Sequence, residues 1–507
     1  MTNATTIVEL ISRGADDATA LSAPGGTPLS YRQLRGLVTE TMAALNAFGI
    51  GRDDRVALVL DNGPHAASAF LAIAAGATAA PLNAGYRAEE FEFYLSDLRA
   101  RLLIIEAGKT SPAIEIATKL GIPVARLALA PERGSGAFSL ELPAGTTTAE
   151  RPGAAQPDDI ALVLHTSGTT SRPKIVPLRQ RNVCASARNV AAALALTPGD
   201  RALNIMPLFH IHGLIAGVLA PLSVGGAVAC SPGFNALKFF GWMSECKPTW
   251  YTAVPTMHQA ILMRARNHAD IIRQNPLRFI RSSSSAMPPQ VIHELEEVFG
   301  APLIEAYGMT EAAHQMASNP LPPAVRKPGT VGRAAGPEVC ILDDDGQPAP
   351  PNTVGEIAIR GPNVMTGYEN NPKANAEAFT NGWFRTGDQG VMDEEGYVAL
   401  TGRLKEIINR GGEKISPREV DEVLMDHPAV QQCLTFAVPH DKLGEEVAVV
   451  VVLREGIEAT AVELRDYAAT RLADFKVPKK VVFRAEIPKG ATGKLQRIGL
   501  AQKLGLA

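Results

Sequence analysis

Residues Asp159–Lys174, with the sequence DIALVLHTSGTTSRPK, place an apolar segment directly before a loop of hydroxyl side chains. The apolar part, Asp159–Leu164, has the uninterrupted pattern of a strand buried on both faces of a parallel sheet. The loop supplies hydroxyl groups, a glycine and two cations, which are groups that bind a polyphosphate. It lacks the G-x-x-x-x-G-K-[ST] pattern of an ordinary P-loop. Because the loop follows the carboxyl end of a strand, a binding site is favoured over a plain Ser/Thr-rich surface loop.

Strand-like and helix-like segments alternate on both sides of this stretch. Short apolar strands are expected at Arg55–Leu60, Arg101–Ile105 and Trp250–Val254, and Ala-rich helical stretches such as Ala66–Ala75 separate them. The alternation predicts α/β layers with largely parallel sheets. Around Gly332–Gly361 the pattern changes to short strands and turns, which predicts a β-rich subdomain.

A smaller unit is expected at the end of the chain. Helices are predicted at Ser416–Asp426 and Ala461–Leu472, and the segment VAVVVVL at Val447–Leu453 predicts a strand. We therefore expect a large N-terminal domain of layered α/β subdomains over residues 1–402, followed by a small α+β domain over residues 403–507.

Composition excludes several classes of function. The 507 residues carry 49 Lys+Arg against 52 Asp+Glu, and this near balance gives no reason to expect a nucleic acid or an anionic membrane as partner. Five cysteines without C-x-x-C spacing fit neither a disulfide framework nor a zinc site. The apolar stretches 66–82 and 211–233 each divide better into a buried helix and a short strand than into a membrane span. The first residues lack a secretory signal pattern, so a cytoplasmic location is expected.

Five motifs occur in an order that resembles one protein family. They are TSGTTSRPK (166–174), YGMTE (307–311), WFRTGD (383–388), GRLKEIINRGGEKISP (402–417) and PKGATGK (488–494). One such loop would be weak evidence, but five in order across nearly the whole chain are specific. In these motifs the chain is similar to the adenylate-forming enzymes, which include acyl-CoA synthetases, luciferases and peptide-synthetase adenylation domains. The resemblance implies ATP-dependent activation of a carboxylic acid, transfer of the acyl group to coenzyme A, and a mobile C-terminal domain.

The nucleotide-binding residues follow partly from chemistry and partly from this resemblance. Thr310 is expected to open a helix whose N–H groups face a phosphate, and Glu311 offers the hard oxygen ligands that magnesium prefers. An ionised Asp388 is an acceptor that suits two ribose hydroxyls. The resemblance assigns it this role, with Arg403 as a second contact to the nucleotide. Alone, these residues would be assigned to an ordinary capped helix, a turn and a surface salt bridge. The implied ATP-binding set is Thr166, Ser167, Gly168, Thr169, Thr170, Ser171, Lys174, Glu305, Ala306, Tyr307, Gly308, Met309, Thr310, Asp388 and Arg403.

The resemblance also assigns residues to domain movement and catalysis. Lys405 matches the hinge, while Gly411 and Gly412 match a segment near CoA, although a simple turn is the default interpretation of such a pair. Lys494 lies in a glycine-flanked tail and matches the cation that assists adenylation. Such a cation is useful because a carboxylate attacks the α-phosphorus while pyrophosphate leaves, and both are anions. The implied catalytic set is Lys494, Thr310, Glu311 and Lys174.

The choice of acid depends on a second group of residues. The segments PLFHIHG (207–213) and RSSSSA (281–286) match the family's acyl pocket, and helical spacing would put His314 on the same face as Thr310. Imidazoles and hydroxyls suit a short substrate that keeps a second carboxylate, whereas a fatty-acyl or aryl tunnel would require apolar side chains or glycine. Six stretches are HTSGTTSRPK (165–174), PLFHIHGLIAG (207–217), WYTAVPTMHQ (250–259), RFIRSSSSA (278–286), EAYGMTEAAHQMASNPLP (305–322) and INRGGEKISP (408–417). In these stretches the chain resembles the oxalyl-CoA synthetases of plants and fungi in particular. We therefore expect oxalate, with His210, Ser284 and His314 at its distal carboxylate.

The sequence leaves several alternatives open for the substrate and the function. The acid could be malonate or a medium-chain fatty acid, a luciferase-like enzyme would use the adenylate for oxygenation, and a non-catalytic relative would be a binding module. Ser283–Ser285 could be turn residues. His210 and His212 could be core histidines or half of a metal site, although no further ligand joins them at a suitable spacing.

Overall fold

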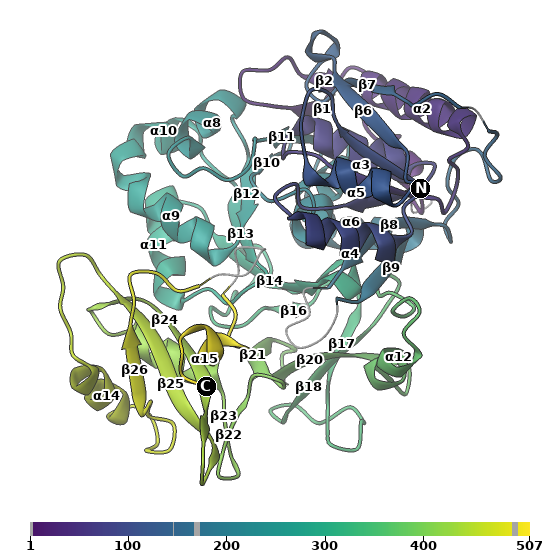
Figure 1. Cartoon of the computed structure of the whole chain (residues 1–507). Helices are drawn as coiled ribbons and strands as arrows, with labels where there is room; N and C mark the ends of the chain where they lie inside the picture. The colour runs from purple at the N-terminus through teal and green to yellow at the C-terminus, as the bar shows by residue number, and fades with distance from the viewer. Residues whose placement is uncertain (1–3, 146, 167–172, 489–494) are drawn as a thin grey trace. The chain divides into compact units, whose positions relative to one another are not determined.

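The computed structural model describes residues 4–145, 147–166, 173–488 and 495–507 (Figure 1). These residues divide into two compact units. Of the described residues, the first unit holds those within 4–166, 174–339 and 359–379, and the second holds residue 173 and those within 340–358 and 380–507. The domain boundary expected after residue 402 stays a prediction. None of the helices in the described ranges is long and apolar enough to cross a membrane.

A seven-stranded sheet in the first unit contains the apolar segment that precedes the phosphate-loop motif. Its five central strands are parallel, and antiparallel strands close both edges. In spatial order the strands are β7 (Phe138–Glu141), β6 (Val124–Leu129), β5 (Leu102–Glu106), β3 (Arg55–Val59), β4 (Thr78–Pro81), β8 (Ile160–His165) and β9 (Ile175–Arg179). Four successive residues of β8 are buried, as a strand covered on both faces requires.

A nine-stranded sheet forms the rest of the framework of this unit. Six of its strands, from β14 to β1 in the order below, pair in parallel, and the others are antiparallel. In order they are β16 (Arg333–Ala334), β15 (His314–Ser318), β14 (Leu303–Met309), β13 (Phe279–Ser283), β12 (Trp250–Ala253), β10 (Arg201–Asn204), β11 (Ala227–Cys230), β1 (Thr19–Ser22) and β2 (Leu29–Ser30). The carboxyl ends of the parallel strands therefore meet at one edge, where ligands of α/β proteins bind.

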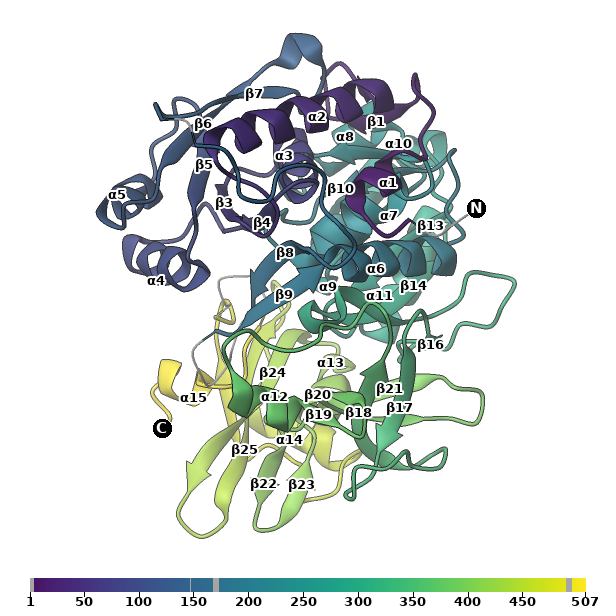
Figure 2. The same cartoon turned by 90° about the vertical axis from the view of Figure 1, so that its right-hand side faces the viewer.

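Two helices form a layer shared by both sheets. Helix α3 (Pro64–Ala74) contacts β4 and β8 of the first sheet and β1 and β11 of the second. Helix α6 (Gln180–Ala193) likewise contacts β8 and β9 on one side and β15 on the other. Every residue of α3 from Ala66 to Ala74 is buried, because a helix between two sheets has no solvent-facing side. Figure 2 shows α4 (Ala88–Leu98) and α5 (Pro112–Lys119) on the opposite face of the first sheet.

The sequence-based elements agree with these bounds to within a few residues, with one clear exception. The apolar stretch 66–82 is helix α3 followed by strand β4, and 211–233 contains a π-helix (Gly213–Leu219) and strand β11, as predicted. The helix expected to begin at Thr310 is wrong. Thr310–Ala312 forms a single 3-10 turn, and β15 begins at His314.

The cause of this error is a tight reversal of the backbone. Strand β14 continues to Met309 and pairs antiparallel with β15, with an irregularity in register between Tyr307 and Gly308. Ala313 and His314 have φ angles of +48° and +99°, which an α-helix cannot contain. The i, i+4 argument for His314 and Thr310 therefore fails, and any proximity of the two comes from the reversal instead.

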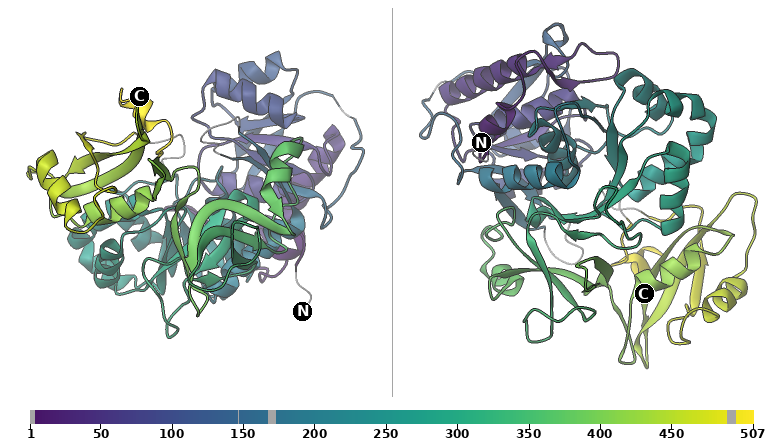
Figure 3. Two further views of the ribbon diagram at one scale, coloured as in Figure 1. Left: turned by 90° about the horizontal axis from the view of Figure 1, so that it is seen from below. Right: turned by 180° about the vertical axis from the view of Figure 1, so that it is seen from behind.

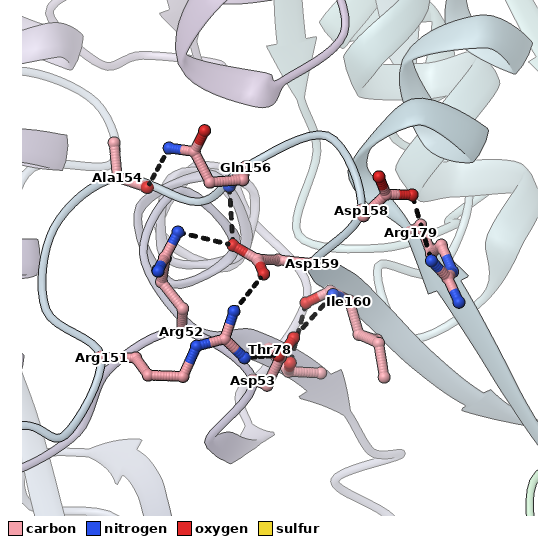
Figure 4. Close-up of polar contacts among 10 residues, drawn as sticks. All are labelled: Arg52, Asp53, Thr78, Arg151, Ala154, Gln156, Asp158, Asp159, Ile160 and Arg179. Atoms are coloured by element: carbon pink, nitrogen blue, oxygen red, sulfur yellow. Dashed lines mark hydrogen bonds and ion pairs between the residues drawn. The ribbon is translucent and has the colours of Figure 1, made fainter.

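Strand β8 is held at its start by a buried carboxylate (Figure 4). Asp159 accepts hydrogen bonds from the Arg151 guanidinium at 2.8 Å and from the Gln156 backbone N–H at 2.7 Å, and Arg52 lies at 3.5 Å. Its side chain is 7% exposed, whereas that of the neighbouring Asp158 is 60% exposed. The network fixes the amino end of the strand whose carboxyl end carries the phosphate-loop motif.

We expect Asp159→Asn to destabilise the first unit by about 2 kcal/mol, because charge-assisted hydrogen bonds to a buried carboxylate are lost. Asp158→Asn is the matched control, since its exposed pairing with Arg179 contributes under about 1 kcal/mol. Urea unfolding of the full chain, followed by circular dichroism, measures both changes. Equal midpoints for the two variants would contradict the anchoring role.

The second unit contains two five-stranded sheets. The first has the order β17 (Glu338–Leu342), β18 (Val354–Arg360), β20 (Trp383–Met392) and β19 (Phe379–Thr380), with β21 (Val398–Arg403) paired to β20. The turn residues Asp343–Gln347 follow β17, and the Asp343 N–H donates to the Gln347 carbonyl at 2.9 Å.

The other sheet of this unit is covered on both faces (Figure 3). Its order is β23 (Glu413–Ile415), β22 (Ile408–Arg410), β25 (Gly444–Leu453) and β24 (Val430–His440), with β26 (Lys480–Phe483) paired to β25. Helices α13 (Pro417–Met425) and α14 (Ala461–Ala469) share one apolar cluster with β25. Helix α15 (Leu500–Lys503) contributes to the cluster on the other face.

Candidate active site

The described part of the phosphate-loop motif lies at the ends of strands β8 and β9. The Thr166 N–H donates to the Lys174 carbonyl at 3.0 Å, and the Lys174 N–H donates to Thr166 Oγ1 at 3.2 Å, so these bonds close the base of the loop. The predicted ligands Ser167, Gly168, Thr169, Thr170 and Ser171 lie outside the described residues.

Lys174 and Glu311 are brought together by a tyrosine that sequence reasoning missed. The Lys174 Nζ lies 4.3 Å from the centroid of the Tyr368 ring, and the Tyr368 hydroxyl donates to Glu311 Oε1 at 2.8 Å. Burial, with the nearby Glu311 charge as a second cause, raises the pKa of Tyr368 well above its usual value. The phenol therefore stays protonated and acts as a donor. A cation and a 6% exposed carboxylate thus flank one ring, which suits a site for a magnesium-bound phosphate.

Strand β14 carries residues 305–309 of the implied ATP-binding set, and contacts from two sides fix it. Ser283 donates to the Ala306 carbonyl at 2.9 Å, and the Asn319 N–H donates to the Glu305 carbonyl at 2.8 Å. At Gly308 a Cβ atom would lie 1.8 Å from the His314 carbonyl oxygen, so only glycine fits beside the reversed chain. Tyr307 and Met309 complete this strand.

A group of polar side chains, all buried except the half-buried Ser284, lies at the carboxyl ends of the parallel strands. We call it the histidine–arginine cluster, and it consists of His212, Thr252, Arg281, Ser284, His314 and Gln315. The imidazoles of His212 and His314 are stacked, with centroids 4.8 Å apart and an interplanar angle of 20°. His212 Nδ1 lies 3.1 Å from Ser284 Oγ, and His212 Nε2 lies 2.7 Å from Thr252 Oγ1.

Arg281 lies at the centre of the cluster. One terminal nitrogen contacts His212 Nε2 at 3.3 Å, and the other contacts His314 Nε2 at 3.1 Å and Gln315 Oε1 at 3.2 Å. The residue is 0% exposed, and burial lowers its pKa to about 9. Within the part of the chain that the structure describes, no carboxylate pairs with this guanidinium, and its Nε has no hydrogen-bond partner. An unpaired buried cation is costly, which is a reason to look for an anionic ligand.

Two residues beside Arg281 have unusual backbone conformations. Ser284 has a φ angle of +75° and His314 has a φ angle of +99°, values that residues other than glycine rarely adopt. Such conformations cost about 1 to 3 kcal/mol and cluster at functional sites. Both strained residues belong to the set expected at the distal carboxylate.

The structure groups the expected acid-binding residues differently from the prediction. Ser284 and His314 are linked through His212, whereas His210 is half-buried and its Nδ1 accepts from the His212 backbone N–H at 3.3 Å. His212 and Arg281 lie in the two segments matched to the acyl pocket, but neither was assigned to the distal carboxylate. A cation within the otherwise uncharged strand segment FIRSS was a further signal that could have indicated Arg281.

The second unit brings together two other predicted residues. Asp388 on β20 pairs in register with Arg403 at the end of β21, and the Arg403 Nε contacts Asp388 Oδ1 at 3.1 Å. Asp388 is buried while Arg403 is largely exposed. An acceptor held at this point fits the ribose role, which stays a prediction.

The hinge and CoA candidates lie in the next turns of the same unit. Lys405 is exposed in the turn after β21. Gly411 and Gly412 join β22 to β23 with φ angles of +61° and +98°, which is the pattern of a type I′ hairpin. The turn accounts for both glycines without a ligand, and their contact with CoA stays a prediction. Lys494 lies outside the described residues.

Comparisons with known proteins place the chain in a family. The AMP-binding enzyme family matches residues 9–369, and the AMP-binding enzyme C-terminal domain matches residues 419–494. The chain therefore belongs to the AMP-binding enzyme family. It is an acid–CoA ligase of that family, which uses ATP and CoA as co-substrates.

Curated relatives and solved structures extend over almost the whole chain. An oxalate–CoA ligase of Arabidopsis thaliana is 46% identical, covering 98% of this chain and 97% of its own. An oxalate–CoA ligase of Saccharomyces cerevisiae is 41% identical, with 96% and 95% covered. A sulfoacetate–CoA ligase of Cupriavidus necator is 37% identical, with 95% and 93% covered. The ATP-bound MatB structure from Rhodopseudomonas palustris matches with a TM-score of 0.88 at 29% identity, covering 98% of each chain. The class of enzyme inferred from the five motifs is thus confirmed.

Proposed function

We propose that the chain joins oxalate to CoA in two steps: oxalate and ATP give oxalyl-adenylate and pyrophosphate, and the CoA thiolate then displaces AMP. The observation that carries the choice of acid is the buried guanidinium of Arg281, which lacks a carboxylate partner in the described ranges and lies among two imidazoles and two hydroxyls. These are groups that recognise an anion. An acid that stays negatively charged after its first carboxylate is activated fits such a site, whereas a fatty or aryl chain does not.

The similar proteins support the same choice. Two of them are oxalate–CoA ligases, and a third acts on sulfoacetate, which also carries a second anionic group. Malonate shares this property and is the nearest competing substrate. Oxalate is preferred over malonate because two of the similar relatives are oxalate–CoA ligases.

The adenylation step is assigned to residues of the phosphate-loop motif and its neighbours. Lys174 and Thr310 would bind the phosphates, and Glu311 would hold the magnesium of MgATP. The described residues contain no group of three or more His, Cys, Asp or Glu able to hold a metal ion, so a single carboxylate fits an ion held mainly by phosphate oxygens and water. Bound magnesium neutralises charge on the phosphates. Lys494 supplies the positive charge at the attacking carboxylate and the α-phosphate.

The thioester step is assigned to residues beyond β21. The Asp388–Arg403 pair would hold the nucleotide, and rotation about Lys405 would replace Lys494 by the CoA-binding segment around Gly411 and Gly412. These roles are supported by the resemblance of the motifs. A luciferase-like oxygenase would lack this second step, so AMP release that depends on CoA separates the two functions.

A substrate screen tests the choice of acid. Full-length enzyme with ATP, magnesium and CoA is assayed for pyrophosphate and thioester with oxalate, malonate, acetate, cinnamate and octanoate. We expect oxalate to have the highest kcat/KM. A preference for cinnamate or octanoate would overturn the argument from the histidine–arginine cluster.

A further inference from the structure

The direction of hydrogen bonding in the histidine–arginine cluster follows from the chemistry of its buried cation. A guanidinium has only donors, so each histidine nitrogen that contacts Arg281 must be an acceptor. For His212 and His314 that nitrogen is Nε2. The proton of each neutral imidazole therefore resides on Nδ1. Protonating both stacked rings beside the guanidinium would place three positive charges in one buried cluster, so the neutral forms are favoured.

The contacts of His212 then have fixed roles. Its Nε2 accepts from Thr252 at 2.7 Å as well as from Arg281, and its Nδ1–H donates to Ser284 Oγ at 3.1 Å. Because Ser284 Oγ accepts this bond, its own hydroxyl hydrogen can point to another acceptor. The donors thus run in one direction, from Arg281 through His212 to Ser284.

We propose that Arg281 is a positioning residue for the acid, which acts through the tautomer of His212 to present the Ser284 hydroxyl as a donor to the distal carboxylate. We call this chain of donors the Arg281 relay. It rests on the proposed function for the identity of the acid. The buried charge strengthens each donor along the relay, because aligned hydrogen bonds polarise one another in a low-dielectric interior. The left-handed backbone of Ser284 places its side chain at the end of the relay.

The Tm of variants separates the proposed positioning role of Arg281 from a purely structural role. Arg278, three residues earlier, pairs with the buried Asp200 at 2.5 Å and is an ordinary structural ion pair. Removing it leaves Asp200 with an uncompensated charge and should lower the Tm. Removing Arg281 relieves a buried cation that no carboxylate compensates in the described residues, so the Tm should stay level or rise.

The experiment compares Arg281→Met with Arg278→Met in the full-length enzyme. For Arg281→Met we expect kcat/KM for oxalate to fall about 10²-fold, kcat/KM for acetate to change less than about threefold, and the Tm to be no lower than that of the wild type. For Arg278→Met we expect a lower Tm and an unchanged ratio of the two kcat/KM values. A lower Tm in Arg281→Met with equal losses for both acids would overturn the proposal.

Nuclear magnetic resonance of the enzyme with ¹⁵N-labelled histidine tests the relay without any substrate. We expect His212 and His314 to carry their protons on Nδ1 in the wild type, and both to lose this preference in Arg281→Met. Protons on Nε2 in the wild type would overturn the relay even if oxalate is the substrate. If the screen selects another dianionic acid, the kinetic comparison uses that acid and its monoanionic analogue. The assignment of oxalate as substrate can then be rejected while the Arg281 relay is still supported.

Discussion

Replacing Lys494 by alanine is expected to lower the rate of adenylate formation by about 10²- to 10³-fold, the scale for losing one group that stabilises developing charge. The reaction brings an anionic carboxylate to an anionic phosphate, and an uncharged methyl group cannot offset this repulsion. Thioester formation from preformed oxalyl-adenylate should be spared, because CoA then attacks without pyrophosphate leaving. The two half-reactions are measured separately, by ATP–pyrophosphate exchange and by thioester formation from added adenylate.

Lys489→Ala provides the matched control, since it removes the other lysine of the same PKGATGK motif. This variant should retain adenylation within about threefold, because the resemblance assigns Lys489 no part in adenylation. Equal losses in both half-reactions of Lys494→Ala would contradict the assignment of Lys494 to adenylation.

The second large effect is expected for Glu311→Gln. The amide keeps the size of the side chain but removes the negative charge that we propose to bind magnesium, so kcat/KM for MgATP should fall about 10²-fold. The magnesium concentration needed for half-maximal rate should rise as well. A magnesium titration of initial rates at fixed ATP measures both effects.

Tyr368→Phe tests whether the loss in Glu311→Gln comes from the charge rather than from the hydrogen bond of Glu311. The variant keeps the ring against Lys174 and removes only the hydroxyl that donates to Glu311. We expect a loss of less than about tenfold, as one hydrogen bond to a charged group is removed. A magnesium titration of Glu311→Gln that overlays that of the wild type would exclude Glu311 as the magnesium ligand.

Much of the fold was predictable because its core strands are short, apolar and buried on both faces. β3, β5, β8 and β12 lie within about one residue of their expected bounds, since local hydrophobic pattern and turn residues agree there. The helix expected to begin at Thr310 was wrong because the conformation of this segment depends on pairing with β14. A strand that reverses through residues of positive φ leaves no periodic pattern to detect.

The candidate site was predictable where chemistry depends on adjacent residues and less so where it depends on distant ones. The motifs around Lys174, Glu311 and Asp388 each occupy a few consecutive positions. The role of Tyr368 depends on its contact with Glu311, which is 57 positions away in the sequence. The role of His212 depends on its contact with Ser284, which is 72 positions away. Such contacts arise from the packing of several strands, and one sequence does not show which residues become neighbours.

The most direct test of the account is the ratio of kcat/KM for oxalate to that for acetate in the wild-type enzyme. Acetate keeps the reacting carboxylate and replaces the distal one by a methyl group, so the ratio reports only the recognition of the second charge. A site built from buried donors rejects an analogue that leaves them unpaired, and a ratio of about 10⁴ or more is therefore predicted. A ratio within about tenfold of one would show that the buried donors do not select a second carboxylate, and it would contradict the proposed substrate.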